Sequence, residues 1–144
     1  MARPRGGDWL DEEMQDLSLA GVGALVSALT PGEASTLDLD GEADAATKAG
    51  LRFIGFHVTD RGTPDPSAFR SLVEELRALL DDGTHVVVHC RMGIGRSSLV
   101  AAGVLVAEGI SAADAWSAIS QARGLTVPDT DEQRAWLRDA IERR

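Results

Sequence analysis

Apolar residues along the chain fall into short continuous runs and into stretches with helical spacing. The runs Val22 to Leu29, Leu51 to Val58 and His85 to His89 are rich in β-branched and other apolar side chains, and they predict buried strands. Apolar residues from Phe69 to Leu80 recur every three or four positions, which predicts an amphipathic helix. Because strand and helix signals alternate, we expect an α/β fold of three layers, with a central, mostly parallel sheet of four to five strands and helices on both faces.

Shorter helices are expected from Leu10 to Leu17, from Glu42 to Ala49, after Ser111 and around Trp136, whereas Thr30-Pro31-Gly32 predicts a turn. A chain of 144 residues can bury a hydrophobic core, and no repeat, linker or low-complexity tract interrupts it. We therefore expect residues 1–144 to form one domain.

One stretch predicts chemistry as well as structure: His89-Cys90-Arg91-Met92-Gly93-Ile94-Gly95-Arg96-Ser97-Ser98. It follows the third apolar run and precedes the apolar segment Leu99 to Ala107, so it forms a strand-to-helix turn, where α/β folds place their sites. Gly93 and Gly95 allow backbone N–H groups to converge on an anion at the helix amino terminus. Arg96 can clamp two phosphate oxygens in a bidentate manner. The turn therefore predicts a phosphate site, and its loop residues are Arg91, Met92, Gly93, Ile94, Gly95 and Arg96.

Cys90 is the only cysteine of the chain and begins this loop. Amide dipoles and a guanidinium favour the thiolate, so we expect the pKa of Cys90 to lie below the free-thiol value of about 8.5. Ser97 can donate a hydrogen bond to the sulfur, and His89 can fix the loop through its ring nitrogens. Most lone cysteines are buried core residues, but a loop of the form Gly-x-Gly-Arg-Ser is not core-like. The arrangement predicts a nucleophile.

A thiolate that displaces phosphate from an alcohol or phenol needs an acid to protonate the leaving oxygen. Asp60 follows the second apolar run just as Cys90 follows the third, so both are expected at the carboxyl ends of the strands. Asp65 and Asp38 are competing candidates. Asp65 precedes Pro66 near the start of a helix, where an aspartate commonly serves as a cap. Position alone therefore favours Asp60 only modestly.

The net charge of −9, with a single lysine, disfavours a nucleic-acid surface, and it requires any anion site to be built from backbone dipoles and a few arginines. One cysteine cannot form an internal disulfide, and neither a signal peptide nor an apolar run of about 20 residues is present. We expect a cytoplasmic protein with no membrane partner. Three histidines without a second cysteine or an acidic cluster at ligand spacing predict neither a metal site nor a cofactor.

The sequence His89-Cys90-x5-Arg96-Ser97 resembles the signature of the cysteine-dependent protein tyrosine and dual-specificity phosphatases. Asp60-Arg61-Gly62-Thr63-Pro64-Asp65 resembles the general-acid loop of the small members, particularly the cyclin-dependent-kinase-associated type, in which the first aspartate is the acid. The resemblance therefore implies that Asp60 is the general acid. Arg123-Gly124 followed by Gln133 resembles the segment in which relatives place a glutamine near the attacking water, although a surface position for Gln133 fits the sequence equally well.

This resemblance implies a protein phosphatase that hydrolyses phosphotyrosine through a phosphocysteine on Cys90, with phosphoserine and phosphothreonine as further candidate substrates. The absence of tyrosine from the chain implies a shallow, dual-specificity-like pocket. The expected partner is a phosphorylated protein or a small phosphomonoester, and the sequence contains no signal for an oligomeric state. Two other functions stay open: a rhodanese-like sulfurtransferase that carries a persulfide on Cys90, and a non-catalytic module that binds phosphorylated ligands.

Overall fold

A computed structural model describes residues 1–142. In chain order the elements are η1 (Gly7–Trp9), α1 (Leu10–Leu19), β1 (Val22–Ser27), α2 (Pro31–Thr36), α3 (Glu42–Lys48), β2 (Arg52–Gly55), α4 (Pro66–Asp81), β3 (His85–His89), α5 (Arg96–Ala107), α6 (Ala112–Arg123), α7 (Asp131–Trp136) and the π-helical segment η2 (Leu137–Glu142). The alternation of strands and helices confirms the predicted α/β class. None of these helices combines the length and apolar character needed to cross a bilayer.

The sheet has the strand order β2-β1-β3, and all pairs are parallel. Val26 of β1 pairs with Ile54 of β2 on one side and with Val88 of β3 on the other. The expectation of four to five strands was wrong for the part of the chain that is described, which contains three. Each of the three apolar runs forms one strand, and the other described segments with regular structure have helical patterns.

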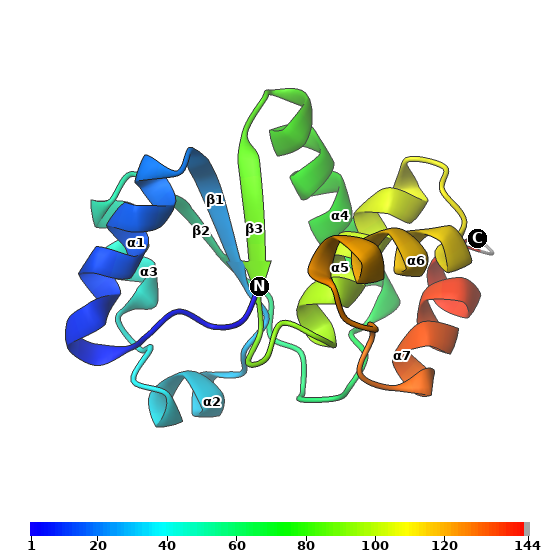
Figure 1. Cartoon of the computed structure of the whole chain (residues 1–144), viewed down its shortest axis with the longest axis horizontal. Helices are drawn as coiled ribbons and strands as arrows, with labels where there is room; N and C mark the ends of the chain where they lie inside the picture. Colours follow the sequence, from blue (N-terminus) through cyan, green and yellow to red (C-terminus); the bar gives the residue numbers. More distant parts are fainter. Residues whose placement is uncertain (143–144) are drawn as a thin grey trace.

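Helices cover both faces of the sheet, as predicted, with α1 and α3 on one face and α4 and α5 on the other (Figure 1). Side chains alternate between the two faces along each strand. Leu25 packs into the core beneath α1 and α3, whereas its neighbour Val26 packs into the core beneath α4 and α5. The second core contains Phe69 of α4, whose ring packs edge to face on Trp136 at a centroid distance of 4.9 Å.

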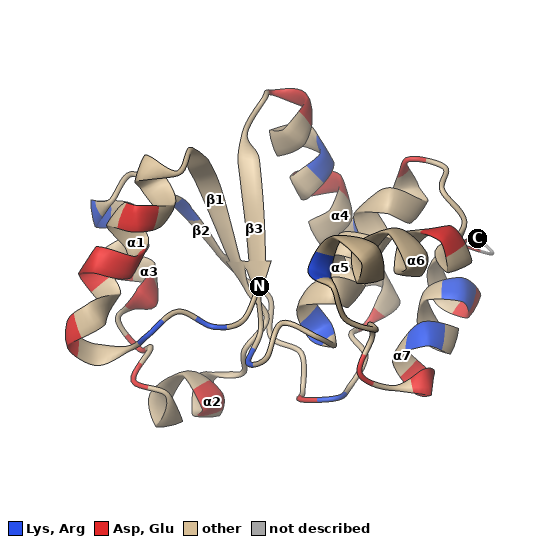
Figure 2. Ribbon diagram, in the orientation of Figure 1, with Lys and Arg blue, Asp and Glu red and all other residues tan. Residues whose placement is uncertain are grey.

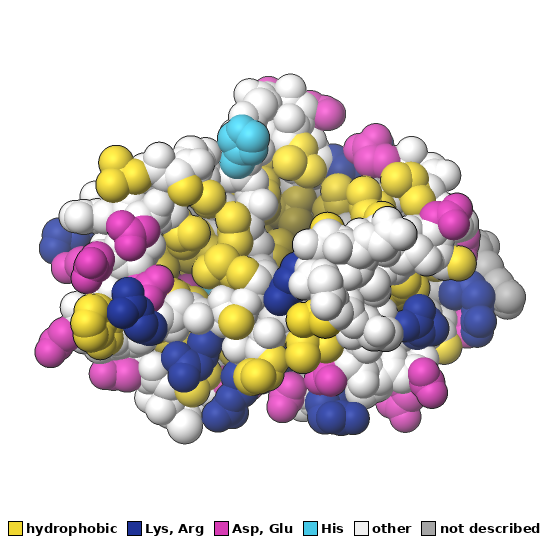
Figure 3. All heavy atoms as spheres, in the orientation of Figure 1, with side chains coloured by type: hydrophobic (Ala, Val, Ile, Leu, Met, Phe, Trp, Pro, Cys, Tyr) yellow, Lys and Arg dark blue, Asp and Glu magenta, His cyan; other side chains and the backbone are white. Residues whose placement is uncertain are grey.

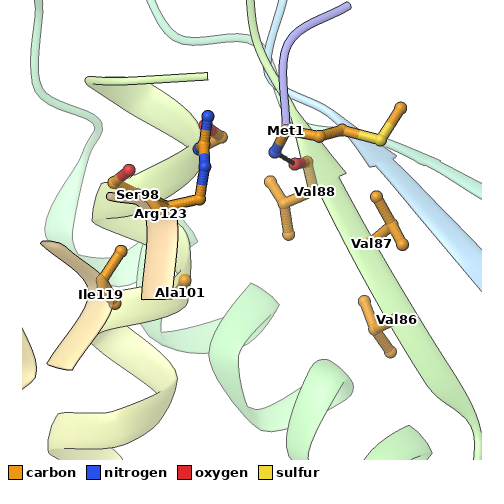
Figure 4. A pocket seen from close by; sticks show the side chains of 9 residues that line it. Met1, Val86, Val87, Val88, Ser98, Ala101, Ile119 and Arg123 are labelled. Atoms are coloured by element: carbon orange, nitrogen blue, oxygen red, sulfur yellow. Dashed lines mark hydrogen bonds between the residues drawn. The ribbon is translucent and has the colours of Figure 1, made fainter. Parts of the chain in front are cut away.

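The open edge of β3 faces the viewer in Figure 1, and apolar side chains gather in a hollow over it between α1 and α6 (Figure 3). A groove of about 270 Å³ lies here, and Val86, Ala101 and Ile119 are among its lining residues (Figure 4). The amino terminus lies over the end of β3, where the Met1 ammonium donates a hydrogen bond to the Val88 carbonyl oxygen at 2.7 Å. The edge of β3 is therefore only partly covered.

The segments that follow β1, β2 and β3 meet at the carboxyl end of the sheet, which is the lower end in Figure 1. The first of these segments contains α2, where a turn was predicted. Thr30 accepts a hydrogen bond from the Glu33 backbone N–H, the Glu33 side chain accepts from the Thr30 N–H, and Pro31 occupies the first helical position. This capping box stabilises a short helix that apolar periodicity does not reveal.

Candidate active site

The phosphate loop runs from the end of β3 to the beginning of α5. Cys90 directly follows β3 and is 3% exposed, and Arg96 is the first residue of α5. Gly93 has a left-handed φ of 74°, and a Cβ at this position would lie 2.5 Å from the Met1 carbonyl carbon. Glycine is therefore required at position 93 for the path of the loop.

Cys90 is surrounded by hydrogen-bond donors. Burial by itself raises the pKa of the thiol, but hydrogen bonds from the Ser97 hydroxyl and from the Ser97 and Gly93 backbone amides, together with the charge of Arg96, lower it below its ordinary value. The sulfur lies 3.3 Å from Ser97 Oγ. The structure thus brings Ser97 to the sulfur as predicted, and it favours the thiolate.

The Arg96 guanidinium is buried and held from several directions. Its Nη1 donates to the Val58 carbonyl oxygen at 2.9 Å and to Glu33 Oε1 at 2.6 Å. Its Nη2 donates to Glu33 Oε2 at 2.9 Å and to Asp60 Oδ1 at 3.2 Å. Arg96 is therefore tied to the segments that follow β1 and β2 before any substrate binds.

Glu33 is a site residue that the sequence reasoning missed. Its carboxylate forms a bidentate pair with Arg96, and this hydrogen bonding, with a smaller contribution from Thr30, lowers the pKa of Glu33 to about 2 against the opposing effect of burial. A local signal existed, because Thr30-Pro31-Gly32-Glu33 has the spacing of a capping box with proline at the first helical position. Nothing local indicated Arg96 as the second partner of the carboxylate.

The three candidate acids lie in different surroundings. Asp60 lines the same pocket as Cys90 and contacts Arg96, and its side chain is 56% exposed. Asp65 caps α4 instead, because its Oδ2 accepts a hydrogen bond from the Ala68 backbone N–H at 2.9 Å. Asp38 has a left-handed φ of 58° and its carbonyl oxygen accepts from the Gly7 N–H, away from the pocket lining. The structure therefore brings Asp60, and neither competitor, to Cys90.

A pocket of about 270 Å³ opens at the phosphate loop. Its lining residues are Asp60, Arg61, Cys90, Arg91, Met92, Gly95, Arg96 and Asp129. Met92 is exposed and lines the pocket, whereas the Ile94 side chain packs against the apolar core and leaves only its backbone to the loop. Asp129, which lies just before α7, is exposed and also lines the pocket.

Gln133 is fully buried, so its alternative interpretation as a surface residue was wrong. Its Nε2 donates to the Gly62 carbonyl oxygen at 3.1 Å, and its Oε1 accepts from the Thr130 backbone N–H at 3.3 Å. A Cβ at Gly95 would lie 3.0 Å from both amide atoms. Gln133 therefore connects the acid loop, the phosphate loop and the start of α7.

His89 and Glu42 form a buried pair behind the phosphate loop. His89 Nε2 lies 2.5 Å from Glu42 Oε2, and its Nδ1 lies 3.1 Å from the Cys90 carbonyl oxygen. His89 is 0% exposed and Glu42 is 3% exposed. His89 thus occupies the supporting position expected of it, but the sequence gave no indication of Glu42 as its partner.

Charged residues are distributed unevenly around the site. Acidic residues lie on α1, α2 and α3, while basic residues lie in the amino-terminal segment and in the loops at the lower end of the sheet (Figure 2). Within residues 1–142, no group of three or more His, Cys, Asp or Glu side chains is arranged to hold a metal ion. Among the residues that line the pocket, Arg61, Arg91 and Arg96 are the basic ones, and Asp60 and Asp129 are the acidic ones.

Comparisons with known proteins agree with this geometry. A family model described as "Polymorphic toxin system, DSP-PTPase phosphatase" matches residues 1–110. The chain is 27% identical over 132 residues to cyclin-dependent kinase inhibitor 3 of Rattus norvegicus, and the match covers 90% of this chain and 62% of that protein. The chain therefore spans about three-fifths of the length of the curated relatives it matches.

Two solved structures have the same fold. The structure of the kinase-associated phosphatase with its catalytic cysteine replaced by serine matches with a TM-score of 0.87 and 26% identity, covering 94% of this chain and 80% of that one. The structure of Tk-PTP in its active form matches with a TM-score of 0.81 and 23% identity, covering 93% of this chain and 86% of that one. The second likeness is evidence for the fold alone.

Proposed function

The chain belongs to the DSP-PTPase phosphatase family of polymorphic toxin systems, and on that premise we propose that it hydrolyses phosphate monoesters of proteins through a phosphocysteine intermediate on Cys90. Phosphotyrosine is the first substrate to test, followed by phosphoserine and phosphothreonine. The observation that carries the proposal is the pocket in which a cysteine of lowered pKa, a buried arginine and a solvent-accessible aspartate meet. A reducing compartment suits a single nucleophilic cysteine, and the proposal includes the cytoplasm as the site of action.

In the first step, the Cys90 thiolate attacks phosphorus as the bond between phosphorus and the ester oxygen breaks. Asp60 donates its proton to the departing oxygen, while Arg96 and the loop amides stabilise the equatorial oxygens. In the free protein Asp60 accepts a hydrogen bond from Arg96 Nη2. A bound phosphate competes for this N–H and thereby frees the Asp60 carboxyl for the leaving group.

In the second step, water attacks the phosphocysteine as the bond between phosphorus and sulfur breaks. The Asp60 carboxylate takes a proton from the water, and the Ser97 hydroxyl stabilises the departing thiolate. Gln133 contributes differently from what its resemblance to a water-holding glutamine implies, because its amide is already engaged with Gly62 and Thr130. We assign it the role of bracing the acid loop.

The test compares wild type with Cys90→Ser on p-nitrophenyl phosphate and on a panel of phosphopeptides. The wild type is expected to hydrolyse these esters, and the serine variant to lose turnover while still binding phosphate. The matched variants Asp60→Asn and Asp65→Asn distinguish the proposed general acid from the aspartate that caps α4. The first change is expected to lower kcat by about 10²- to 10⁴-fold, and the second to lower stability by about 1 kcal/mol with kcat nearly unchanged.

Unchanged turnover in Cys90→Ser would exclude the phosphocysteine. Transfer of sulfur from thiosulfate to cyanide without hydrolysis of any phosphoester would replace the proposal with the sulfurtransferase. Phosphopeptide binding without hydrolysis by the wild type would replace it with the binding module.

A further inference from the structure

We propose that Glu42, the first residue of α3, is a positioning residue for the nucleophile, and that it acts through the hydrogen bond that its carboxylate accepts from His89. This inference rests on the proposed role of Cys90 and extends it to a helix on the opposite side of the sheet from α5. Glu42 touches neither the pocket nor the sulfur. Its effect must therefore pass through His89.

The contacts of His89 define where its protons lie. A carbonyl oxygen can only accept, so the contact of 3.1 Å with the Cys90 carbonyl requires a proton on Nδ1. The contact of 2.5 Å between Nε2 and Glu42 Oε2 requires a second proton between these two atoms. The proposal places this proton on the ring, because imidazole is a stronger base than a carboxylate. His89 is therefore an imidazolium facing a carboxylate.

Burial keeps the two residues together. The exposed fraction is 0% for His89 and 3% for Glu42, so either charge without the other would be desolvated and uncompensated. Removal of one partner leaves the other charge buried without a counter-charge, which is strongly unfavourable. His89 is also fixed through its backbone, because its carbonyl oxygen accepts from the Ala28 N–H at 2.9 Å. The pair is thus a rigid support at the junction of β3 and the phosphate loop.

The imidazolium lies nearer to the nucleophile than the carboxylate does, because its Nδ1–H is bonded to the Cys90 carbonyl. The pair therefore presents its positive end to the thiolate. Arg96 of α5 and the Met1 ammonium favour the thiolate, and Arg61, Arg91, Asp60 and Asp129 line the same pocket, where the two aspartates oppose it. Removal of the Glu42 charge leaves these groups in place and removes only the imidazolium.

Glu42→Gln isolates this effect. The glutamine amide can donate to a neutral Nε2, so His89 keeps its Nδ1 proton and its bond to the Cys90 carbonyl while losing its charge. The rate of Cys90 alkylation by iodoacetamide as a function of pH is the readout, because it reports the thiolate fraction without requiring catalysis. The midpoint is expected to move to higher pH by about one unit, a tenfold loss of thiolate at low pH. The acid limb of the pH profile of kcat/KM is expected to move to higher pH by the same amount.

The matched control is Asp44→Asn, which removes a charge from an exposed position on the same helix. Its alkylation midpoint is expected to equal that of the wild type. An unchanged midpoint in folded Glu42→Gln would overturn the proposal and leave the pair a purely structural contact. A shifted midpoint in a protein without phosphatase activity would support the proposal while refuting the proposed function.

If Glu42→Gln does not fold, a second variant tests the same proposal. The double variant Glu42→Gln with His89→Gln contains no buried charge at this position, and circular dichroism verifies that it is folded. The pH midpoint of Cys90 alkylation in the double variant is expected to be raised at least as far as in the single variant. A wild-type midpoint in the folded double variant would overturn the proposal.

Discussion

At the scale of single residues, the two carboxylates on Arg96 have different consequences. Glu33 accepts from both Nη atoms and is largely buried, whereas Asp60 accepts from Nη2 alone and is half-exposed. Because its pKa is depressed to about 2, Glu33 stays ionised above that pH, and its contribution to stability is complete above the ordinary glutamate value and lost as the pH falls through 2. An acid limb of the pH–rate profile near neutrality must therefore come from another group.

Glu33→Gln tests whether this pair orients Arg96 for phosphate. Glutamine can replace glutamate in a capping box, so α2 is expected to persist while Arg96 keeps only the half-exposed Asp60 as a carboxylate partner. We expect kcat/KM for p-nitrophenyl phosphate to fall by about 10- to 100-fold, a loss comparable to that of one charge-assisted hydrogen bond. Thr30→Ala is the control, because it removes the cap and costs about 1 kcal/mol of stability without touching the guanidinium. Equal kcat/KM in Glu33→Gln and wild type would contradict the orienting role.

At the scale of elements, the position of α5 depends on its close contact with α4. Gly103 of α5 faces the Phe69 ring, and a methyl group at this position would overlap the ring atoms. Gly103→Ala is therefore expected to destabilise the fold by about 1–3 kcal/mol through overpacking. Gly32→Ala in α2 meets no atom within 4 Å and is expected to stabilise the fold by up to about 1 kcal/mol. Thermal unfolding measures both, and a stabilising Gly103→Ala would show that the two helices can separate without cost.

The sequence allowed much of this arrangement to be predicted, because the relevant signals were local. The phosphate loop and the acid loop are contiguous segments whose residue types indicate both conformation and chemistry. Glu42 offered no such signal, since an acidic residue in the first turn of a helix usually interacts with the helix dipole at the surface. It becomes a buried partner of His89 only when α3 packs beside the end of β3. The expected fourth and fifth strands are missing from residues 1–142 because each of the three apolar runs forms one strand and the other regular segments are helices.

At the scale of the whole molecule, the net charge of −9 opposes the approach of an anionic substrate, while Arg61, Arg91 and Arg96 attract it at short range. Salt weakens the distant repulsion before it weakens contacts inside the pocket, because the screening length falls from about 30 Å at 10 mM to about 8 Å at 150 mM ionic strength. We therefore expect kcat/KM for a phosphate dianion to rise by less than about tenfold over this range of sodium chloride. The rate of Cys90 alkylation by uncharged iodoacetamide is the control and should change little. A steady decrease of kcat/KM from the lowest salt would mean that the arginines at the pocket, rather than the net charge, dominate the field that the substrate meets.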